Sequence, residues 1–255
     1  MLPFAPFAPF WQDAPDISLA AAQSPASPDA RGEKACPEGM LLVQGQHYEN
    51  VERLCTDYRN LRCWSFWPGL MAQEPRVTPI SVCMDQYEWP NRAGKTPQVM
   101  VRFVEAEELC ASAGKRLCTE FEWETACEGP DTRPWPYGFS YDPQICNTAK
   151  PYLPVSEAKL NSRDKKVRQK ETWRVWQGAP AGAFPACVSP QGIVDLVGNV
   201  EEWVQTQRPE WPYRSSLKGG FWAKPGAACR GTNDSHGPMF RFYEVGFRCC
   251  KDPEL

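Results

Sequence analysis

The sequence predicts a disulfide-stapled domain in which short strands and two helices are joined by long irregular segments. Eleven Trp, 26 Pro and 18 Gly in 255 residues combine rigid aromatic side chains with many turn formers, which is typical of well-packed irregular structure. The twelve cysteines form no C-x-x-C pair and are accompanied by only two histidines, so disulfides are favoured over a zinc site. Because disulfides persist in oxidising compartments, we expect a periplasmic, cell-surface or secreted protein.

Composition disfavours two other classes of protein. No apolar run reaches the roughly 18 residues that a membrane-spanning helix needs. A net charge of −3 gives no general attraction to the phosphates of nucleic acid. We therefore expect neither a membrane-spanning nor a nucleic-acid-binding protein.

Residues 1–35 are predicted to form a tail or linker, because they hold six Pro and nine Ala with no helix or strand period. The stretch PFAPFAPF at 3–10 repeats an aromatic every third residue, which polyproline II would align along one edge. Residues 1–12 are therefore a candidate tether to a protein partner in a larger assembly. A tether whose Phe residues contact nothing is the simpler alternative.

Residues 36–255 are expected to form one domain, which begins with two short strands. A Pro-Glu-Gly turn leads into the apolar run at 40–43, the first predicted strand. Turn formers are mixed with aromatic residues and two cysteines at 55–79, so an irregular loop held by a local disulfide is expected there. Residues 80–87 alternate as a second strand.

Two helices are predicted next. Apolar residues recur every three or four positions over 101–113, and Gly114 follows as a helix-ending residue. The second helix begins at Thr119, where Glu122 completes a T-x-x-E capping box, and it ends before Gly129. The C-terminal third, which is rich in Gly and Trp, contains no pattern for a long helix.

A basic insertion is predicted at 151–177. Residues 159–174 hold seven basic and two acidic side chains with few apolar ones. A solvated insertion is the simplest interpretation, and a basic surface for a partner is the alternative.

Six sequence motifs resemble, in this order, those of the formylglycine-generating enzyme family, also called the sulfatase-modifying factor family. This family includes the C-terminal domain of ergothioneine synthase and PvdO-type proteins. The resemblance implies an α+β fold related to C-type lectins and rich in irregular structure. The motifs are GMLLVQG at 39–45, AGKRLCTEFEWETAC at 113–127, PYG at 136–138, GIVDLVGNVEEW at 192–203, KGGFW at 218–222 and GFRC at 246–249.

The resemblance also implies two disulfides, Cys110 with Cys249 and Cys127 with Cys229. Free buried thiols are the alternative, since Cys also packs as a small hydrophobic residue. A bridge between Cys118 and the cysteine at 250 is attractive, because the latter directly follows Cys249. Apart from the local disulfide expected at 55–79, the resemblance implies no partner for the other cysteines.

A calcium loop is implied at DLVGNVEEW, where Asp195, Gly198, Val200 and Glu202 occupy the family's ligand positions. Calcium takes six to eight hard oxygen ligands, and carboxylates offset its charge. The alternative is that the two carboxylates only hydrogen-bond the backbone of a tight turn. A second calcium site is expected to involve Asn147.

The catalytic centre of the family is not matched. The resemblance implies two cysteines that bind copper(I) and oxidise a substrate Cys in the active members, yet residues 221–228 contain no cysteine. Phe221 stands at a family Ser and Glu201 at a family Trp. Copper(I) requires soft thiolate ligands, so copper and formylglycine synthesis are not expected.

Two further hypotheses concern the two histidines. A non-haem iron site would need His47 and His236 to converge with a carboxylate such as Asp234. By the resemblance, His236 lies in a loop that faces the family's active-site groove, where it would contact a ligand together with Trp222 and Arg230. A solvent-exposed loop histidine is the alternative.

The expected function is an extracytoplasmic binding or structural module that recognises a protein or glycan, on a scaffold that has lost its copper centre. The sequence leans against an enzyme. The alternative is an oxidoreductase of the PvdO or sulfatase-modifying-factor type, which uses a metal such as iron or another cofactor.

Overall fold

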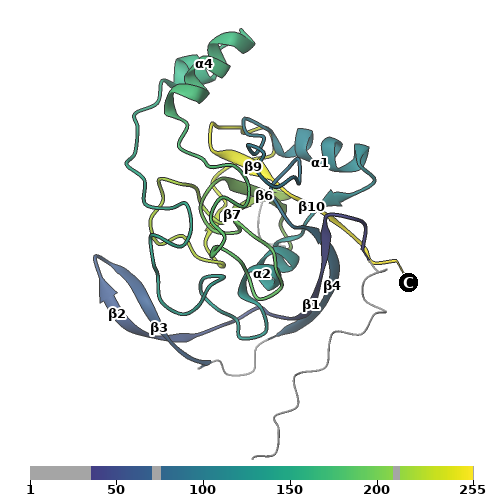
Figure 1. Ribbon diagram of the computed structural model, residues 1–255, viewed down its shortest axis with the longest axis vertical. Coiled ribbons are helices and arrows are strands. Elements are labelled where there is room, and N and C mark those ends of the chain that lie inside the picture. The colour runs from purple at the N-terminus through teal and green to yellow at the C-terminus, as the bar shows by residue number, and fades with distance from the viewer. Residues whose placement is uncertain (1–35, 71–75, 209–212, 255) are drawn as a thin grey trace, which may run out of the picture. The chain divides into compact units, whose positions relative to one another are not determined.

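The computed structural model describes residues 36–70, 76–208 and 213–254 (Figure 1). The predicted tail at 1–35, with its PFAPFAPF stretch, lies outside the described residues. The strands are β1 Met40–Tyr48, β2 Arg53–Arg59, β3 Arg62–Leu70, β4 Val77–Asp85, β5 Arg116–Leu117, β6 Glu201–Gln205, β7 Ser215–Lys218, β8 Thr232–Asn233, β9 Val245–Phe247 and β10 Cys249–Lys251. The helices are α1 Phe103–Ser112, α2 Glu120–Glu128, α3 Glu157–Leu160 and α4 Lys165–Val175. This mixture of helices and strands confirms the predicted α+β fold.

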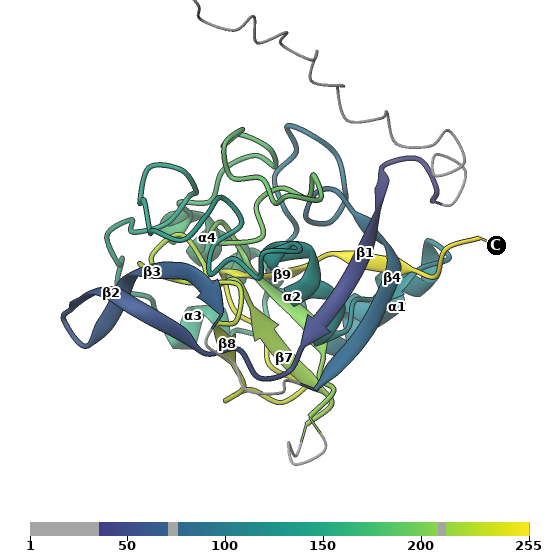
Figure 2. The same cartoon turned by 90° about the horizontal axis from the view of Figure 1, so that it is seen from below.

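Two four-stranded sheets and one hairpin organise the described residues. One sheet has the order β1-β4-β10-β5, the other the order β8-β7-β6-β9, and β2 pairs with β3. Figure 2 shows β1 and β4 as one long twisted ladder, in which the two strands are antiparallel. In the second sheet, β6 and β9 are parallel, so these two strands begin at the same edge of the sheet.

Both predicted strands exist, but each differs in length from the prediction. The strand expected at 40–43 continues to Tyr48. The strand expected at 80–87 begins at Val77 and ends at Asp85. Each of the nine residues of one strand faces a residue of the other, which extends both beyond their apolar segments.

The expectation of an irregular loop at 55–79 is wrong, because β2 and β3 form a hairpin there. The strand could not be predicted from its apolar residues, because Leu54 and Tyr58 face solvent at 50% and 65% exposure. The turn at Asn60 and Leu61 has positive φ at both residues, the conformation in which Asn-Gly is the usual signal. The expected local disulfide is present, joining Cys55 to Cys63 across the hairpin.

The two predicted helices are confirmed. Helix α1 buries Phe103, Ala106 and Cys110 on one face. Helix α2 begins after Thr119, whose hydroxyl accepts the Glu122 N–H while the Glu122 carboxylate accepts the Thr119 N–H. Its predicted stop at Gly129 has φ +61, and a Cβ at this position would lie 2.6 Å from a Pro190 side-chain carbon.

The basic insertion is only partly solvated, which corrects the sequence interpretation. It contains α3 and α4, and its Leu160 and Val175 are 1% and 0% exposed. These two side chains join a buried cluster with Trp222 and Tyr243. Two apolar residues 15 positions apart were too few to reveal this anchoring in the sequence.

All twelve cysteines of the chain form six disulfides. Cys110–Cys249 and Cys127–Cys229 are the pairs that the resemblance implies, and Cys118–Cys250 is the pair that adjacency suggested. The remaining pairs are Cys36–Cys83, Cys55–Cys63 and Cys146–Cys187. Six disulfides indicate folding in an oxidising compartment. In the described residues, every helix is too short or too polar to cross a membrane.

Candidate functional site

Two carboxyl side chains lie together at one edge of the second sheet. Glu201 opens β6, and Glu244 directly precedes β9, its parallel neighbour. The Glu201 N–H donates to the Glu244 carbonyl at 2.9 Å. Because parallel strands start at the same sheet edge, residues 43 positions apart in sequence are placed side by side.

Glu201 is buried with few partners. Its side chain is 4% exposed, and its carboxylate accepts hydrogen bonds from Lys224 at 3.4 Å and from Asn233 at 3.2 Å. Burial raises the pKa of Glu201, while Lys224 and Asn233 act in the opposite direction. Lys224 is half-exposed, so it links this buried carboxylate to the surface.

Glu244 is 7% exposed and its Oε2 atom has no hydrogen-bond partner among the described residues. Burial, together with the neighbouring Glu201, raises the pKa of Glu244 to about 8. At neutral pH this carboxyl therefore holds its proton most of the time and can donate as well as accept a hydrogen bond.

Glu201 lies between two cavities. A cavity of about 610 Å³ is lined by Glu201, Glu244, Asn233 and His236, among others. A smaller one of about 340 Å³ is lined by Glu201, Lys224 and the segment at 225–228. A volume of several hundred Å³ beside convergent polar groups is typical of a ligand site.

Of the predicted ligand-contact residues, only His236 lines either cavity. Its ring stacks on Phe240 with centroids 3.6 Å apart, and burial, assisted by Lys224, lowers its pKa. Trp222 is instead fully buried and packs 4.8 Å from Trp176. Arg230 is engaged by a carboxylate of α2, Glu128, to which its Nη2 donates at 3.0 Å.

The two histidines do not share a site. His47 is buried, hydrogen-bonds Glu124 at 2.6 Å and stacks on Phe121 at 4.0 Å, whereas His236 lies in the cavity beside Glu201. Asp234 accepts a hydrogen bond from Arg208 at 3.1 Å. Within the described ranges, no group of three or more His, Cys, Asp or Glu side chains is arranged to hold a metal ion.

A buried lysine connects α2 to the strand that precedes the GG turn. Lys218 is fully buried and its Nζ lies 2.8 Å from Glu120 and also donates to Glu124 and Thr232. Burial alone would raise the pKa of Glu124, but Lys218 and then His47 lower it to about 2. The ammonium therefore stays paired with two carboxylates in the core.

The predicted calcium loop is a strained, buried turn. Asp195 and Asn199 have φ of +58 and +50, and Gly198 has φ +79. A Cβ on Gly198 would lie 2.4 Å from the Asn147 carbonyl oxygen, so only glycine fits. The Asp195 carboxylate accepts the Gly182 N–H at 2.6 Å. Such a bond to the backbone is what is expected if Asp195 stabilises a tight turn without calcium.

Glu202 of the same loop binds a buried arginine. Its carboxylate accepts from Nε and Nη2 of Arg248 at 2.7 and 2.6 Å and from the Trp123 indole at 2.8 Å. Glu88 and Asp195 also lie near, and burial, Asp195 and Glu202 all raise the pKa of Glu88. Three carboxyls thus surround one guanidinium.

The oxygens of this cluster are the hard kind of donor that calcium takes. Their arrangement is not that of a metal site, because both oxygens of Glu202 are engaged by Arg248 and the described residues contain no group of three acids placed to hold a metal ion. Asn147, whose Nδ2 donates to Asn199 at 3.0 Å, keeps a buried Oδ1 atom without a partner in the described structure. By the resemblance, Asp195, Glu202 and the carbonyls of Gly198 and Val200 would hold the first calcium ion, and Asn147 would belong to the second site.

Sequence reasoning missed Glu244 and used Glu201 only as a departure from the family. The signal available was an acidic pair at 201–202, where the resemblance implies an aromatic residue followed by one acid. Nothing local to residue 244 indicates that it faces Glu201, since that contact depends on the β6–β9 pairing.

Comparison with known proteins identifies the scaffold. A formylglycine-generating enzyme of Mycobacterium tuberculosis is 31% identical over 157 residues, which cover 59% of this chain and 44% of that protein. A hercynine oxygenase of Mycolicibacterium smegmatis is 32% identical over 123 residues, covering 47% and 24%. The inactive Cα-formylglycine-generating enzyme 2 of Bos taurus is 34% identical over 113 residues, covering 44% and 33%. The chain thus spans less than half the length of these relatives.

One solved structure extends the comparison to the fold. PvdO from Pseudomonas aeruginosa superposes with a TM-score of 0.52 at 17% identity, covering 85% of this chain and 94% of that one. The family model described as the Sulfatase-modifying factor enzyme 1-like domain matches residues 41–253. This range includes the Glu201 site and both sheets apart from the first residue of β1. The chain therefore belongs to the sulfatase-modifying factor family.

Proposed function

We propose that this chain is a binding module of the oxidising compartment, periplasmic, cell-surface or secreted, that recognises a protein or glycan at the Glu201 site. The observation that carries the proposal is that all twelve cysteines are oxidised to disulfides, so none is a thiolate. Thiolates are the ligands that copper(I) chemistry requires. By the resemblance, active members of the family carry these cysteines in the segment that corresponds to residues 221–228. Here that segment contains no cysteine and places Lys224 beside Glu201.

The polar groups of the site support recognition of a donor-rich ligand group. Glu201 is a buried acceptor, and it lines one cavity with Glu244, His236 and Asn233. A ligand hydroxyl or ammonium that reaches these groups could donate to their carboxyl oxygens. The sugar hydroxyls of a glycan and the lysine ammonium of a protein both offer such donors.

The first test counts thiols and metals in one sample. The metals of the folded protein are measured first by elemental analysis. The protein is then unfolded without reductant and treated with an alkylating reagent, and its intact mass is measured by mass spectrometry. We expect no alkylated thiol and no stoichiometric copper or iron. Two alkylatable thiols together with copper or iron would overturn the binding-module proposal in favour of an enzyme.

The second test addresses recognition directly. A glycan array that includes amino sugars is probed with the protein, with Glu201→Gln and, as matched control, with Glu38→Gln, an exposed residue outside both cavities. Binding should be lost with the first variant and kept with the second. Equal binding by both variants would place recognition elsewhere.

A structural calcium ion at the Asp195 loop is part of the proposal, and its support is the resemblance of this loop to the family's calcium loop together with its hard oxygen donors. Calcium would neutralise part of the charge of Glu88, Asp195 and Glu202. Removal of calcium with EGTA should lower the midpoint of thermal unfolding, and re-addition should restore it. An unchanged midpoint, with no calcium detected by elemental analysis, would leave a turn held by hydrogen bonds and Arg248 alone.

An oxidoreductase is the second candidate, supported by the similarity to hercynine oxygenase. His236, Glu201 and Glu244 line one cavity, but in the described structure they form no group arranged to hold a metal ion. Imidazole and carboxylate side chains are ligands for non-haem iron. Stoichiometric iron that disappears in His236→Ala would support this function.

A further inference from the structure

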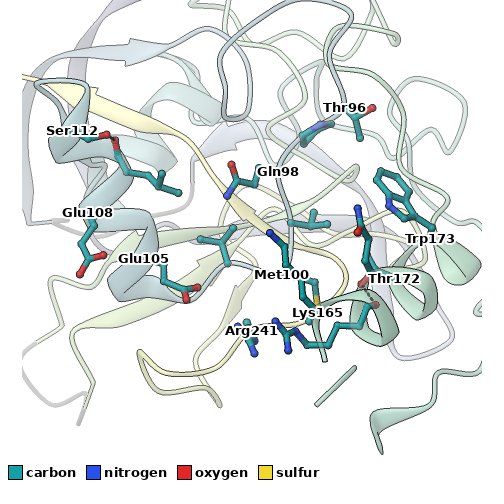
Figure 3. Close-up of a pocket in the computed structure, with 16 residues that line it drawn as sticks. Thr96, Gln98, Met100, Glu105, Glu108, Ser112, Lys165, Thr172, Trp173 and Arg241 are labelled. Atoms are coloured by element: carbon teal, nitrogen blue, oxygen red, sulfur yellow. Dashed lines mark hydrogen bonds between the residues drawn. The ribbon is translucent and has the colours of Figure 1, made fainter. Parts of the chain in front are cut away.

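A groove between α1 and α4 forms a further cavity of about 680 Å³, which is lined by residues of both helices and of the segment at 96–101. Its volume lies in the range of small-molecule sites. Figure 3 shows Glu105 and Glu108 on the α1 side, Thr172 and Trp173 on the α4 side, and Met100 between them. This groove contains neither Glu201 nor Glu244, although Arg241 lines both this groove and the cavity at Glu201.

The floor and one wall of the groove are apolar. Val99, Met100, Leu109 and Trp173 line it. Trp173 is 50% exposed even though its ring contacts Trp176 at 5.4 Å. Met100 has φ +60, a conformation that is rare for a side chain of this size and is found preferentially at functional sites. These surfaces suit the apolar body of a ligand.

The groove also carries three basic side chains, Lys165, Arg168 and Arg241. The Arg168 guanidinium donates to two backbone carbonyls, at 2.6 and 3.0 Å, and no ion pair in the described structure includes it. Figure 3 shows Lys165 and Arg241 toward the same end of the groove. Neither has a salt-bridge partner among the residues that the structure describes.

The guanidiniums repel one another. Burial lowers the pKa of Arg241, and the neighbouring charges of Arg102 and Arg168 lower it further, while Glu105 opposes them. Glu105 is already engaged, because its Oε2 accepts the Arg102 N–H at 2.8 Å and its Oε1 lies 3.7 Å from Arg102 Nη1. An anion bound between Arg168 and Arg241 would relieve this repulsion.

Glu108 is the remaining acid of the groove. It lies one helical turn beyond Glu105 on α1 and is exposed, so solvent screens its charge. The groove therefore has a cationic end that lacks an internal counter-ion, next to an apolar floor.

We propose that this groove binds an organic anion with an apolar body, whose charged group lies between Arg168 and Arg241 and whose body packs on Met100, Leu109 and Trp173. The basic insertion thereby supplies one wall of a ligand site. Charge complementarity fixes the sign of the ligand, and the cavity volume fixes its size class.

Two probes that share a skeleton test the proposal. 8-Anilinonaphthalene-1-sulfonate carries an anionic group on two aromatic bodies, and N-phenyl-1-naphthylamine is the same skeleton without the sulfonate. Titrations followed by probe fluorescence give the Kd for each, and calorimetry gives the stoichiometry of the sulfonate. We expect one sulfonate per chain, bound at least about tenfold more tightly than the neutral probe.

Three variants decide where the sulfonate binds. Arg241→Gln and Arg168→Gln should each weaken sulfonate binding about tenfold and leave the neutral probe unchanged. Arg92→Gln, which removes an exposed charge outside the groove, is the matched control and should change neither. Arg168 does not line the Glu201 cavity, so Arg168→Gln separates a loss at the groove from a change at the cavity that Arg241 also lines. Circular dichroism reports whether each variant folds.

Three outcomes would overturn the proposal. The first is sulfonate binding that is unchanged in both groove variants. The second is equal affinity of the two probes for the unaltered protein. The third is a loss of affinity in Arg92→Gln as large as in Arg241→Gln, which would indicate a general charge effect.

Discussion

Replacement of Glu244 by Gln should stabilise the protein increasingly as the pH rises. The pKa of this carboxyl increases from an ordinary 4.5 to about 8 on folding, so between these values the folded state holds a proton that the unfolded state has released. Stability therefore falls as the pH rises through this window. At 1.36 kcal/mol for each pH unit above 4.5, the cost is roughly 3 kcal/mol at pH 7. Glu244→Gln keeps a neutral side chain of the same shape and removes this cost.

The assay is urea unfolding with disulfides intact, followed by tryptophan fluorescence at pH 4.5, 7 and 8.5. The variant should match the unaltered protein at pH 4.5, exceed it by about 3 kcal/mol at pH 7 and exceed it by somewhat more at pH 8.5. Groups that do not interact with residue 244 titrate alike in the two proteins, so the difference reports residue 244 together with its interaction with Glu201.

Glu157→Gln is the control, since Glu157 lines the same cavity but is exposed. It should change stability by less than about 0.5 kcal/mol at every pH. A constant difference between Glu244→Gln and the unaltered protein from pH 4.5 to 8.5 would refute the reasoning, because it would mean that Glu244 titrates alike in the folded and unfolded states.

Three further changes probe the scaffold. Replacing Cys127 and Cys229 by Ala opens a disulfide with a sequence separation of 102 residues. Because the intact Cys118–Cys250 bridge shortens this loop in the unfolded chain, the cost should lie below the roughly 4.7 kcal/mol of a single loop of that length and above the roughly 2.5 kcal/mol of the Cys55–Cys63 bridge with its separation of 8; equal losses in denaturant unfolding would contradict the loop-length explanation. Lys218→Met leaves two buried carboxylates without their ammonium and should cost roughly 3 to 5 kcal/mol, and a loss below about 1 kcal/mol in the same assay would show that water replaces it. Trp222→Ala removes a fully buried side chain and should cost roughly 3 to 5 kcal/mol, whereas Trp67→Ala, at a site 59% exposed, should cost less than about 1 kcal/mol.

Local signals were enough to predict the two helices. The capping box of Thr119 and Glu122 involves residues only three positions apart, and the same pair closes the N-terminus of α2 in the structure. Gly129 stops that helix because only a residue without Cβ accepts both its positive φ and the nearby Pro190. The capping box and the helix-ending glycine depend on residues a few positions apart, whereas the contact of Gly129 with Pro190 is tertiary and could not be predicted.

The β2–β3 hairpin shows where local reading fails. Polar Arg53 and Asp57 point to the covered side, and apolar Leu54 and Tyr58 point to solvent. The usual rule that apolar residues mark the buried face is therefore inverted over this strand. A disulfide between Cys55 and Cys63 replaces part of the missing apolar burial.

The sequence by itself determined the disulfide chemistry, the helices and the family, because cysteine number, capping residues and motif order are properties of the linear chain. Only the tertiary structure decided the sites. Glu201 faces Glu244 because β6 and β9 are parallel neighbours. Trp222 does not line the predicted ligand groove, because it packs with the insertion's Val175 in one buried cluster. Arg168 and Arg241 repel each other across the groove although 73 residues separate them. These contacts join distant segments, and their energies depend on burial that exists only after the chain has folded.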